Sequence, residues 1–344
     1  MQIGDFIIDE NSPVLIIAEL SANHNGSLET ALETVRAAKR AGADCIKLQT
    51  YTADTITIDS RKPDFMIDGT IWNGRNLHDL YKEAYTPWEW HKQIMDLAKE
   101  EGLLCFSSPF DPTSVEFLES LDVPAYKIAS FEITDIPLIE LVASKGKPVI
   151  ISTGIATEED INLALKTCRD VGNNDIILLK CTSSYPAPIE EANMIMVKDF
   201  SEKFNVLAGL SDHTMGSTVP VVATCFGAKV IEKHFILDRS IGGPDSSFSM
   251  TEEEFTEMVN SVREAEKAIG KIDYKLTPKQ EKGKDFSKSL YVVKDIKEGE
   301  LFTKENVKAI RPGFGLHPKY YTNIIGKKAK QNLSKGSRLN ETDF

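Results

Sequence analysis

Two histidines stand at corresponding places in the chain, each at the end of a short apolar run. His213 lies in GLSDHT, at the end of one run, and His234 ends the run VIEKH. Both runs have the length and composition of β-strands. Adjacent strands lie about 4.8 Å apart, so imidazoles at matching positions could share one metal ion. Two ligands are fewer than a structural zinc needs, whereas an open site suits a Lewis acid. The alternative is a pair of ordinary histidines at strand ends.

Polar side chains recur at the ends of the other apolar runs. Lys47 and Lys127 lie inside such runs, where an ammonium group needs a countercharge, and few carboxylates are expected on the same rim. The hydroxyl-bearing residues of the set are Ser108, Ser130, Ser152, Ser183, Tyr185 and Ser211. Small donors beside two lysines are typical of a phosphate or carboxylate site. The alternative is that each lysine pairs with a structural glutamate.

Glu19 is the best candidate for acid–base catalysis. It lies in the apolar run LIIAELS, where burial would raise its pKa. A pairing with Lys47 on the next strand is compatible with that role. The remaining histidines, interpreted as surface or loop residues, are His24, His78, His91 and His317.

The elements that must position these residues alternate between strand and helix. The expected strands are 14–20, 45–50, 103–108, 125–129, 148–153, 176–181, 206–211 and 229–234. Helical periodicity follows nearly all of them; after Cys181 a proline-containing stretch leaves 190–200 less clear. Eight such units in about 260 residues are typical of a (β/α)8 TIM barrel, in which ligands bind at the C-terminal strand ends. An open doubly wound sheet would need a glycine-rich turn after the first strand, and AELSANHNG is not one.

Three segments depart from this rhythm. Residues 52–86 are polar and long enough to indicate a lid or binding loop. Residues 271–285 are charged and are expected to link a barrel domain, 1–270, to a small β-rich domain, 286–344. That domain is near the lower size limit for independent folding, so we expect it to dock on another surface.

Composition excludes several classes of protein. The formal charge is −12, but residues 281–344 carry 14 Lys and Arg against 8 Asp and Glu, so the tail is +6 and the rest −18. This mixed tail lacks the Arg clusters of a nucleic-acid site. Five dispersed cysteines indicate reduced thiols in a cytoplasmic protein. Neither an export signal nor an apolar run of about 20 residues is evident.

A series of ordered motifs resembles the sialic acid synthase family along essentially the whole chain. The motifs are IIAELSANHNGS, IKLQTYT, CFSSPF, AYKIASFE, ISTGIA, GLSDHT, IEKHF and GGPDSSFSM. Members of that family condense phosphoenolpyruvate with an N-acylated aldose to make nine-carbon nonulosonic acids. The tail, with SLYVVKDIKEGELFTKENVKAIRPGFGLHP, resembles the SAF domain, which is similar to type III antifreeze protein.

The resemblance implies roles for individual residues. His213 and His234 would bind a divalent metal, Mn²⁺ or Mg²⁺ and possibly Co²⁺, and Glu19 would act on water or a substrate hydroxyl. The implied phosphoenolpyruvate ligands are Lys47, Ser108, Lys127, Ser130, Ser152 and Ser211. The implied sugar contacts are Gln49, Tyr185, Asp245 and, from the SAF domain of a partner in a domain-swapped homodimer, Arg311. Ser183 stands where sialic acid synthases commonly carry Asn.

Two motifs narrow the resemblance within the family. KIASFE and RPGFGLHPK are most similar to the branch that makes pseudaminic acid from 2,4-diacetamido-2,4,6-trideoxy-altrose, whereas sialic acid synthases more often show KIGSGE. N-acetylmannosamine or the legionaminic acid precursor would be the alternative sugars. A Schiff-base aldolase using Lys127 or Lys180, and a non-enzymatic ice- or polysaccharide-binding protein, are more distant alternatives.

Overall fold

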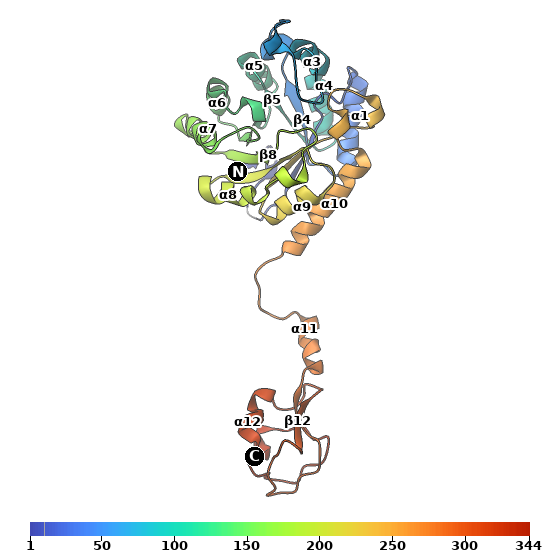
Figure 1. Ribbon diagram of the computed structural model, residues 1–344, viewed down its shortest axis with the longest axis vertical. Helices are drawn as coiled ribbons and strands as arrows, with labels where there is room; N and C mark the ends of the chain where they lie inside the picture. The colour runs from blue at the N-terminus through green and yellow to red at the C-terminus, as the bar shows by residue number, and fades with distance from the viewer. Residues whose placement is uncertain (10) are drawn as a thin grey trace. The chain divides into compact units, whose positions relative to one another are not determined.

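A computed structural model of the chain describes residues 1–9 and 11–344. Eight parallel strands close into a barrel in the order β10-β3-β4-β5-β6-β7-β8-β9 (Figure 1). They are β3 (Leu15–Glu19), β4 (Cys45–Thr50), β5 (Leu104–Pro109), β6 (Tyr126–Ile128), β7 (Val149–Ser152), β8 (Ile176–Cys181), β9 (Leu207–Asp212) and β10 (Val230–His234). The TIM barrel predicted from the alternating pattern is confirmed.

The strands are almost continuously apolar because helices cover the barrel outside and side chains fill it inside. Every residue of β3 and β7 is buried. Gly209 in β9 has a special role: a Cβ built there would lie 2.4 Å from the Val230 backbone oxygen of β10. A side chain at this position would therefore push apart the two strands that lead to His213 and His234.

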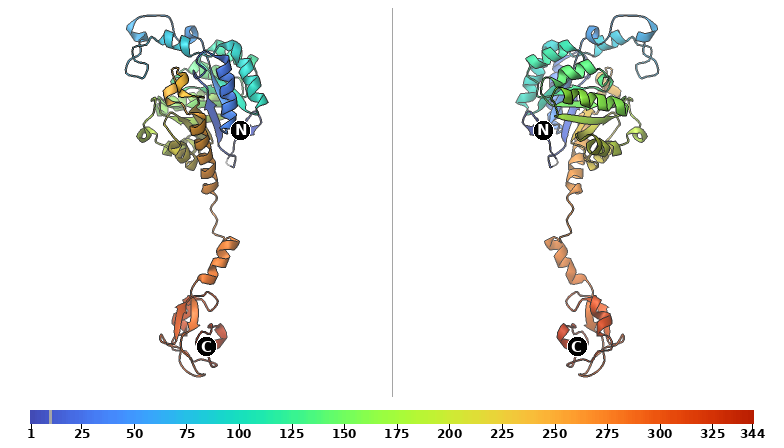
Figure 2. Two further views of the ribbon diagram at one scale, coloured as in Figure 1. Left: turned by 90° about the vertical axis from the view of Figure 1, so that its right-hand side faces the viewer. Right: turned by 90° about the vertical axis from the view of Figure 1, so that its left-hand side faces the viewer.

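Helices surround the ring, as Figure 2 shows from two sides. They are α1 (Leu28–Arg40), α4 (Trp88–Glu100), α5 (Pro112–Ser120), α6 (Ile136–Ala143), α7 (Glu158–Asp170), α8 (Ile195–Phe204), α9 (Thr218–Cys225) and α10 (Glu252–Ile269). Side-chain caps fix the starts of α1, α5, α6, α7 and α10; the Ser27 hydroxyl, for example, accepts from the Thr30 amide at 3.2 Å. Helix α8 completes the unit that the sequence pattern left unclear.

The segment 52–86, between β4 and α4, is more ordered than its polar composition predicts. It contains α2 (Ala53–Ile56), the 3₁₀ turn η1 (Pro63–Phe65) and α3 (Leu77–Ala84). Asn76 caps α3 by accepting from the His78 and Asp79 amides at 3.0 and 3.3 Å. The segment is therefore a folded insertion that can place side chains at fixed positions.

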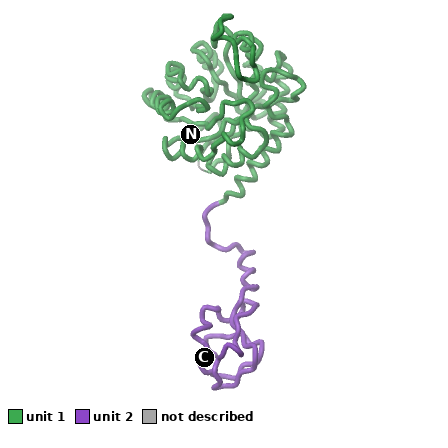
Figure 3. Tube along the Cα trace, viewed as in Figure 1, with its two compact units in different colours: residues 1–270 green, residues 271–344 purple. Residues whose placement is uncertain are grey.

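The chain divides into two compact units, Met1–Gly270 and Lys271–Phe344 (Figure 3). The second contains α11 (Pro278–Gly283) and η6 (Lys284–Phe286), so helical turns occupy part of the segment expected to be a plain linker. Its antiparallel strands β11 (Ser289–Val292) and β12 (Val307–Ile310) cover a small core that includes Leu290 and Phe302. Within the described residues, no helix combines the length and hydrophobicity that crossing a membrane requires.

Candidate active site

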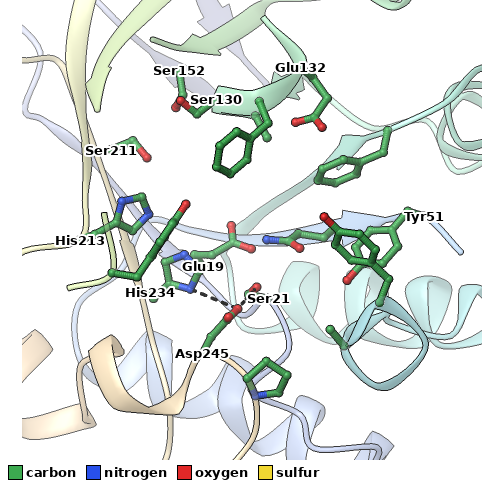
Figure 4. Close-up of a pocket in the computed structure, with 18 of the residues that line it drawn as sticks. Glu19, Ser21, Tyr51, Ser130, Glu132, Ser152, Ser211, His213, His234 and Asp245 are labelled. Carbon is green, nitrogen blue, oxygen red and sulfur yellow. Dashed lines mark hydrogen bonds and ion pairs between the residues drawn. The ribbon is translucent and has the colours of Figure 1, made fainter. Parts of the chain in front are cut away.

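A cavity of about 430 Å³ opens at the C-terminal ends of the barrel strands (Figure 4). The predicted site residues that line it are Glu19, Lys47, Gln49, Lys127, Ser130, Ser152, Tyr185, Ser211, His213, His234 and Asp245. Ser108 and Ser183 lie behind this lining, each in contact with one of its members. Arg311 belongs to the second compact unit, where it is exposed.

Four buried charged groups form the floor of the cavity. Lys47 forms an ion pair with Glu19, the residue opposite it in the β3–β4 register. Lys127 Nζ lies 3.0 Å from Glu232 Oε1, and Lys47 Nζ lies 3.7 Å from the same oxygen. The expectation that few carboxylates lie near the lysines is wrong, because the closed barrel brings Glu232 of β10 across to β4 and β6. Two ammonium groups are thus balanced by two carboxylates.

The ionisation of this cluster depends on burial and on the pairing. Burial raises the pKa of Glu19 to about 7, against the opposing effect of Lys47. Burial also favours the neutral form of Glu232, but Lys127 and Lys47 outweigh it and lower the pKa of that group. One carboxylate is therefore ionised at neutral pH, while Glu19 exchanges its proton near neutrality. Glu19 Oε1 makes no hydrogen bond, so this oxygen is available to take or give a proton.

Hydroxyl groups surround the lysines. Lys47 Nζ donates to Ser108 Oγ at 3.3 Å, and Ser211 Oγ donates to Glu232 Oε1 at 3.4 Å. Ser152 Oγ is buried and has no hydrogen-bond partner. A buried hydroxyl without a partner is uncommon in a folded protein and indicates a place for a ligand or water.

Ser130 and Ser183 form a second hydroxyl pair, 3.0 Å apart. Gly154 makes room for it: a Cβ at this position would lie 2.4 Å from Ser130 Oγ and 2.1 Å from Ser183 Oγ. Ser183 therefore contacts Ser130, which lines the cavity, but does not line the cavity itself.

The imidazoles of His213 and His234 have their ring centroids 5.4 Å apart. His213 Nδ1 lies 3.0 Å from the Thr182 carbonyl oxygen, which leaves Nε2 for a ligand. His234 Nδ1 is buried without a hydrogen-bond partner, 3.8 Å from Asp245 Oδ2 (Figure 4). Burial lowers the pKa of His234 well below its usual range, so the ring is neutral and offers a lone pair.

His213 and His234 supply part of the metal site that the sequence predicts. Among the described residues, no group of three or more His, Cys, Asp or Glu side chains is spaced to hold a metal ion alone. The unpartnered Nδ1 of His234 and the free Nε2 of His213 nevertheless supply two imidazole ligands. The residues fit an open site that water and substrate would complete.

Several cavity residues were missed by the sequence argument. Glu132, in η2 (Ser130–Glu132), lines the cavity; burial raises its pKa to about 7, and its Oε2 has no partner. Its position two residues after Ser130 in KIASFE was the available signal. Ser21 Oγ donates to Asp245 Oδ2 at 2.5 Å and so orients that carboxylate. Phe248 packs against Tyr185 with ring centroids 5.0 Å apart.

The interpretation of the other histidines as surface or loop residues is confirmed for His317, which is exposed, and for His24, which lies in the turn after β3 although it is buried. It is wrong for His78 and His91, which are buried residues of α3 and α4. His91 lies in α4, where its Nε2 is 2.8 Å from Thr50 Oγ1, because α4 packs this polar residue against the outside of the barrel.

The fold and site define a TIM-barrel enzyme whose strand ends combine two buried lysines, a buried carboxyl group with a raised pKa and a histidine pair. The chain belongs to the NeuB family, whose model matches residues 34–274, and the SAF domain model matches residues 287–344. Both resemblances inferred from the motifs are thereby confirmed.

Individual relatives extend along the whole chain. It is 53% identical to a pseudaminic acid synthase of Campylobacter jejuni subsp. jejuni over 344 residues, covering 100% of both chains. It is 48% identical to a pseudaminic acid synthase of Helicobacter pylori, covering 96% of this chain and 98% of that one. A crystal structure of N-acetylneuraminic acid synthetase from Leptospira borgpetersenii, in complex with citrate, matches with a TM-score of 0.74 and 29% identity over 82% of this chain and 94% of that one.

Proposed function

We propose that this chain is a pseudaminic acid synthase, which condenses phosphoenolpyruvate, 2,4-diacetamido-2,4,6-trideoxy-L-altrose and water into pseudaminic acid and phosphate. The observation that carries the proposal is the cavity floor, where two buried lysines and the unpartnered Ser152 hydroxyl lie beside the unpartnered imidazole of His234. This arrangement suits an anion held next to an activated carbonyl. The product is the one in the name of the full-length relatives, and the sugar is the one that the resemblance implies for that branch of the family.

The floor is suited to phosphoenolpyruvate. Lys47 and Lys127 would face its carboxylate and phosphate, and the hydroxyls of Ser130, Ser152 and Ser211 would donate to the same oxygens. Glu19 and Glu232 balance the lysines before the substrate arrives.

The reaction can be written with these groups. C3 of phosphoenolpyruvate attacks the aldehyde carbon of the open-chain sugar, and the aldehyde oxygen takes a proton from solvent. Water adds at C2 and gives up one proton to ionised Glu19, which returns it to solvent. The tetrahedral intermediate then breaks its C2–O bond to phosphate, and the C2 hydroxyl loses its proton to the departing phosphate as the ketone forms. Glu19 carries out the proton transfer because one of its oxygens is free and it titrates near neutrality.

A divalent cation, Mn²⁺, Mg²⁺ or Co²⁺, is part of the proposal. Nε2 of His213 and Nδ1 of His234 would hold it, with Asp245 beside them. When bound it would polarise the aldehyde as a Lewis acid. The protein's own contribution is to hold two rings whose other contacts leave those nitrogens available.

The Schiff-base aldolase alternative finds less support. Lys127 is paired with Glu232, and Lys180 Nζ donates to the Cys181 carbonyl at 2.8 Å outside the cavity lining. Burial lowers the pKa of both lysines, so a Schiff base is disfavoured by these contacts and by the family match, not by the ionisation of the amines.

The test is phosphate release with phosphoenolpyruvate and a panel of open-chain-forming acylamino sugars, with a control lacking sugar. Phosphoenolpyruvate carrying ¹⁸O at the bridging position should pass the label to phosphate, because the C–O bond breaks. Release with N-acetylmannosamine in preference to the trideoxy sugar would reassign the substrate, and sugar-independent or absent release would refute a synthase.

We extend the proposal to a cytoplasmic, domain-swapped homodimer in which Arg311 contacts the sugar in the partner's barrel. Support comes from the five free thiols and from the opposite net charges of the barrel and the tail. Chains carrying Arg311→Ala or His234→Ala should each be inactive, yet co-refolding should restore about a quarter of the sites, since half the dimers are mixed and each has one intact site. No recovery would refute exchange between chains.

A further inference from the structure

Helix α3 directs its apolar stripe at the cavity rather than at the hydrophobic core. Leu77, Leu80, Tyr81 and Ala84 are spaced i, i+3, i+4 and i+7, so they share one face of the helix. All four line the cavity. An apolar helix face is normally covered by the protein's own core, so this one is available to an apolar part of a ligand.

The segment that carries α3 is fastened in place. The Asn76 amide, 4% exposed, donates to the Ser60 and Phe65 carbonyls at 2.8 and 3.2 Å. Trp72 Nε1 donates to the Pro244 carbonyl at 2.9 Å, so the segment, which starts after β4, reaches the loop after β10. A wall that is already ordered binds a ligand without the entropic cost of folding a loop around it.

Aromatic rings extend the wall beyond α3. The Tyr81 ring lies 5.6 Å from that of Tyr51, which lies 5.1 Å from that of Phe110. Phe131 also lines the cavity, and 57% of its surface is exposed. When a ligand covers a large apolar side chain that is exposed in a cavity, the removal of its surface from water favours binding.

The position of the wall relates it to one end of the sugar. Figure 4 shows Tyr51 and Glu132 across the cavity from His213 and His234. Under the proposed function, on which this inference rests, the aldehyde end of the sugar lies at the imidazoles. The opposite end, C5 and C6, then points toward the wall.

We propose that the wall formed by Leu77, Leu80, Tyr81, Ala84, Phe110 and Phe131 selects sugars that end in a C6 methyl group over sugars that end in a hydroxymethyl group. Of the four α3 side chains, only Tyr81 carries a polar atom. A hydroxyl placed against this surface loses hydrogen bonds to water and regains few, whereas a methyl group loses none. The wall does not separate the altrose substrate from the legionaminic acid precursor, because both are 6-deoxy sugars.

The test compares kcat/KM for 2,4-diacetamido-2,4,6-trideoxy-altrose with that for its 6-hydroxy analogue. The wild-type protein should prefer the 6-deoxy sugar by about 10- to 100-fold, the range for one hydroxyl in an apolar pocket. Phe131→Ala removes a largely exposed ring, and Ala84→Ser adds a hydroxyl to the wall. Each should lower the preference by about fivefold or more, with the KM for phosphoenolpyruvate unchanged.

Two matched variants serve as controls. Ile155→Ala removes an apolar side chain that is 47% exposed outside the cavity lining, and Lys82→Ser adds a hydroxyl to an exposed position of α3. Both should keep the wild-type preference. The proposed selectivity of the wall is refuted if the wild-type enzyme turns over both sugars equally. It is also refuted if neither Phe131→Ala nor Ala84→Ser changes the preference for the 6-deoxy sugar. No turnover of the 6-deoxy sugar at all would instead overturn the proposed function, and the inference with it.

Discussion

Replacing Glu232 by glutamine tests whether the cavity floor is an anion site held neutral by its own carboxylates. Glu232 Oε1 lies 3.0 Å from Lys127 Nζ and 3.7 Å from Lys47 Nζ, and these three side chains are at most 8% exposed. Glu232→Gln would leave two buried ammonium groups facing the single carboxylate of Glu19. Losing one partner of a buried ion pair costs about 3–5 kcal/mol, which corresponds to a fall of about 6–20 °C in Tm for a domain of this size.

Inorganic phosphate should reverse much of this loss. The variant floor carries one more positive charge than the wild-type floor, and a charge pair about 4 Å apart is worth about 4 kcal/mol at an effective dielectric constant of 20. A ligand that binds the folded state alone raises stability by RT ln(1 + [L]/Kd). We therefore expect phosphate at millimolar concentration to raise the Tm of Glu232→Gln more than it raises that of the wild type.

Intrinsic tryptophan fluorescence is the appropriate readout, because Trp72, Trp88 and Trp90 all lie in the barrel unit. Glu254→Gln is the control, since Glu254 pairs with Arg239 where both side chains keep contact with solvent, at 38% and 34% exposure, and a solvent-exposed ion pair is worth at most about 1 kcal/mol. If Glu232→Gln melts like this control, or if phosphate stabilises it no more than the wild type, the floor is not an anion site.

Three further predictions concern single groups. Glu19→Gln should lower kcat by about 10²–10⁴-fold. It should also remove the limb of the kcat–pH profile that rises through about pH 7 in the wild type, because Glu19 must be ionised to act as a base. If the variant keeps this limb, the limb belongs to another group. Burial lowers the pKa of His24 and of His91 to about 4, from an unfolded value near 6.5, so both residues should reduce the free energy of unfolding as pH falls from about 6.5 to 4 and should have no effect at higher pH. In urea unfolding, His91→Gln should lose less stability than the wild type over this pH range, and an equal loss would contradict the prediction. His234→Ala should abolish the activity that Mn²⁺, Mg²⁺ or Co²⁺ restores after chelation without lowering the tryptophan-monitored Tm by more than a few degrees, whereas unchanged metal dependence would remove it as a ligand.

The barrel and the candidate site residues were predictable because both follow from local patterns. Parallel strands must be apolar along their whole length, and polar side chains at their ends stand out against that background. Lys47, Lys127, His213 and His234 could therefore be identified from their positions in the runs alone, and all four line one cavity.

The Glu19–Lys47 pair joins adjacent strands and was anticipated from the sequence, but the pairing of Glu232 could not be predicted, because it depends on contacts across the barrel. Glu232 is 105 residues from Lys127, and closure of β10 onto β3 brings them together. Glu132 was missed because a short 3₁₀ turn has no periodicity that distinguishes a buried carboxylate from a surface one. For α3, the stripe was hidden in a segment whose average composition is polar.

The two halves of the cavity are supported by different parts of the chain, and this separation has a consequence for specificity. The two lysines proposed to bind phosphoenolpyruvate lie on barrel strands, and a change in either of them disturbs a closed network of charges. The wall stands largely on the insertion 52–86, which Asn76 and Trp72 fasten through backbone carbonyls outside that network. Substitutions on the α3 face can therefore alter which sugar end is accepted while leaving the ionisation of Glu19, and with it the chemistry at the aldehyde, unchanged.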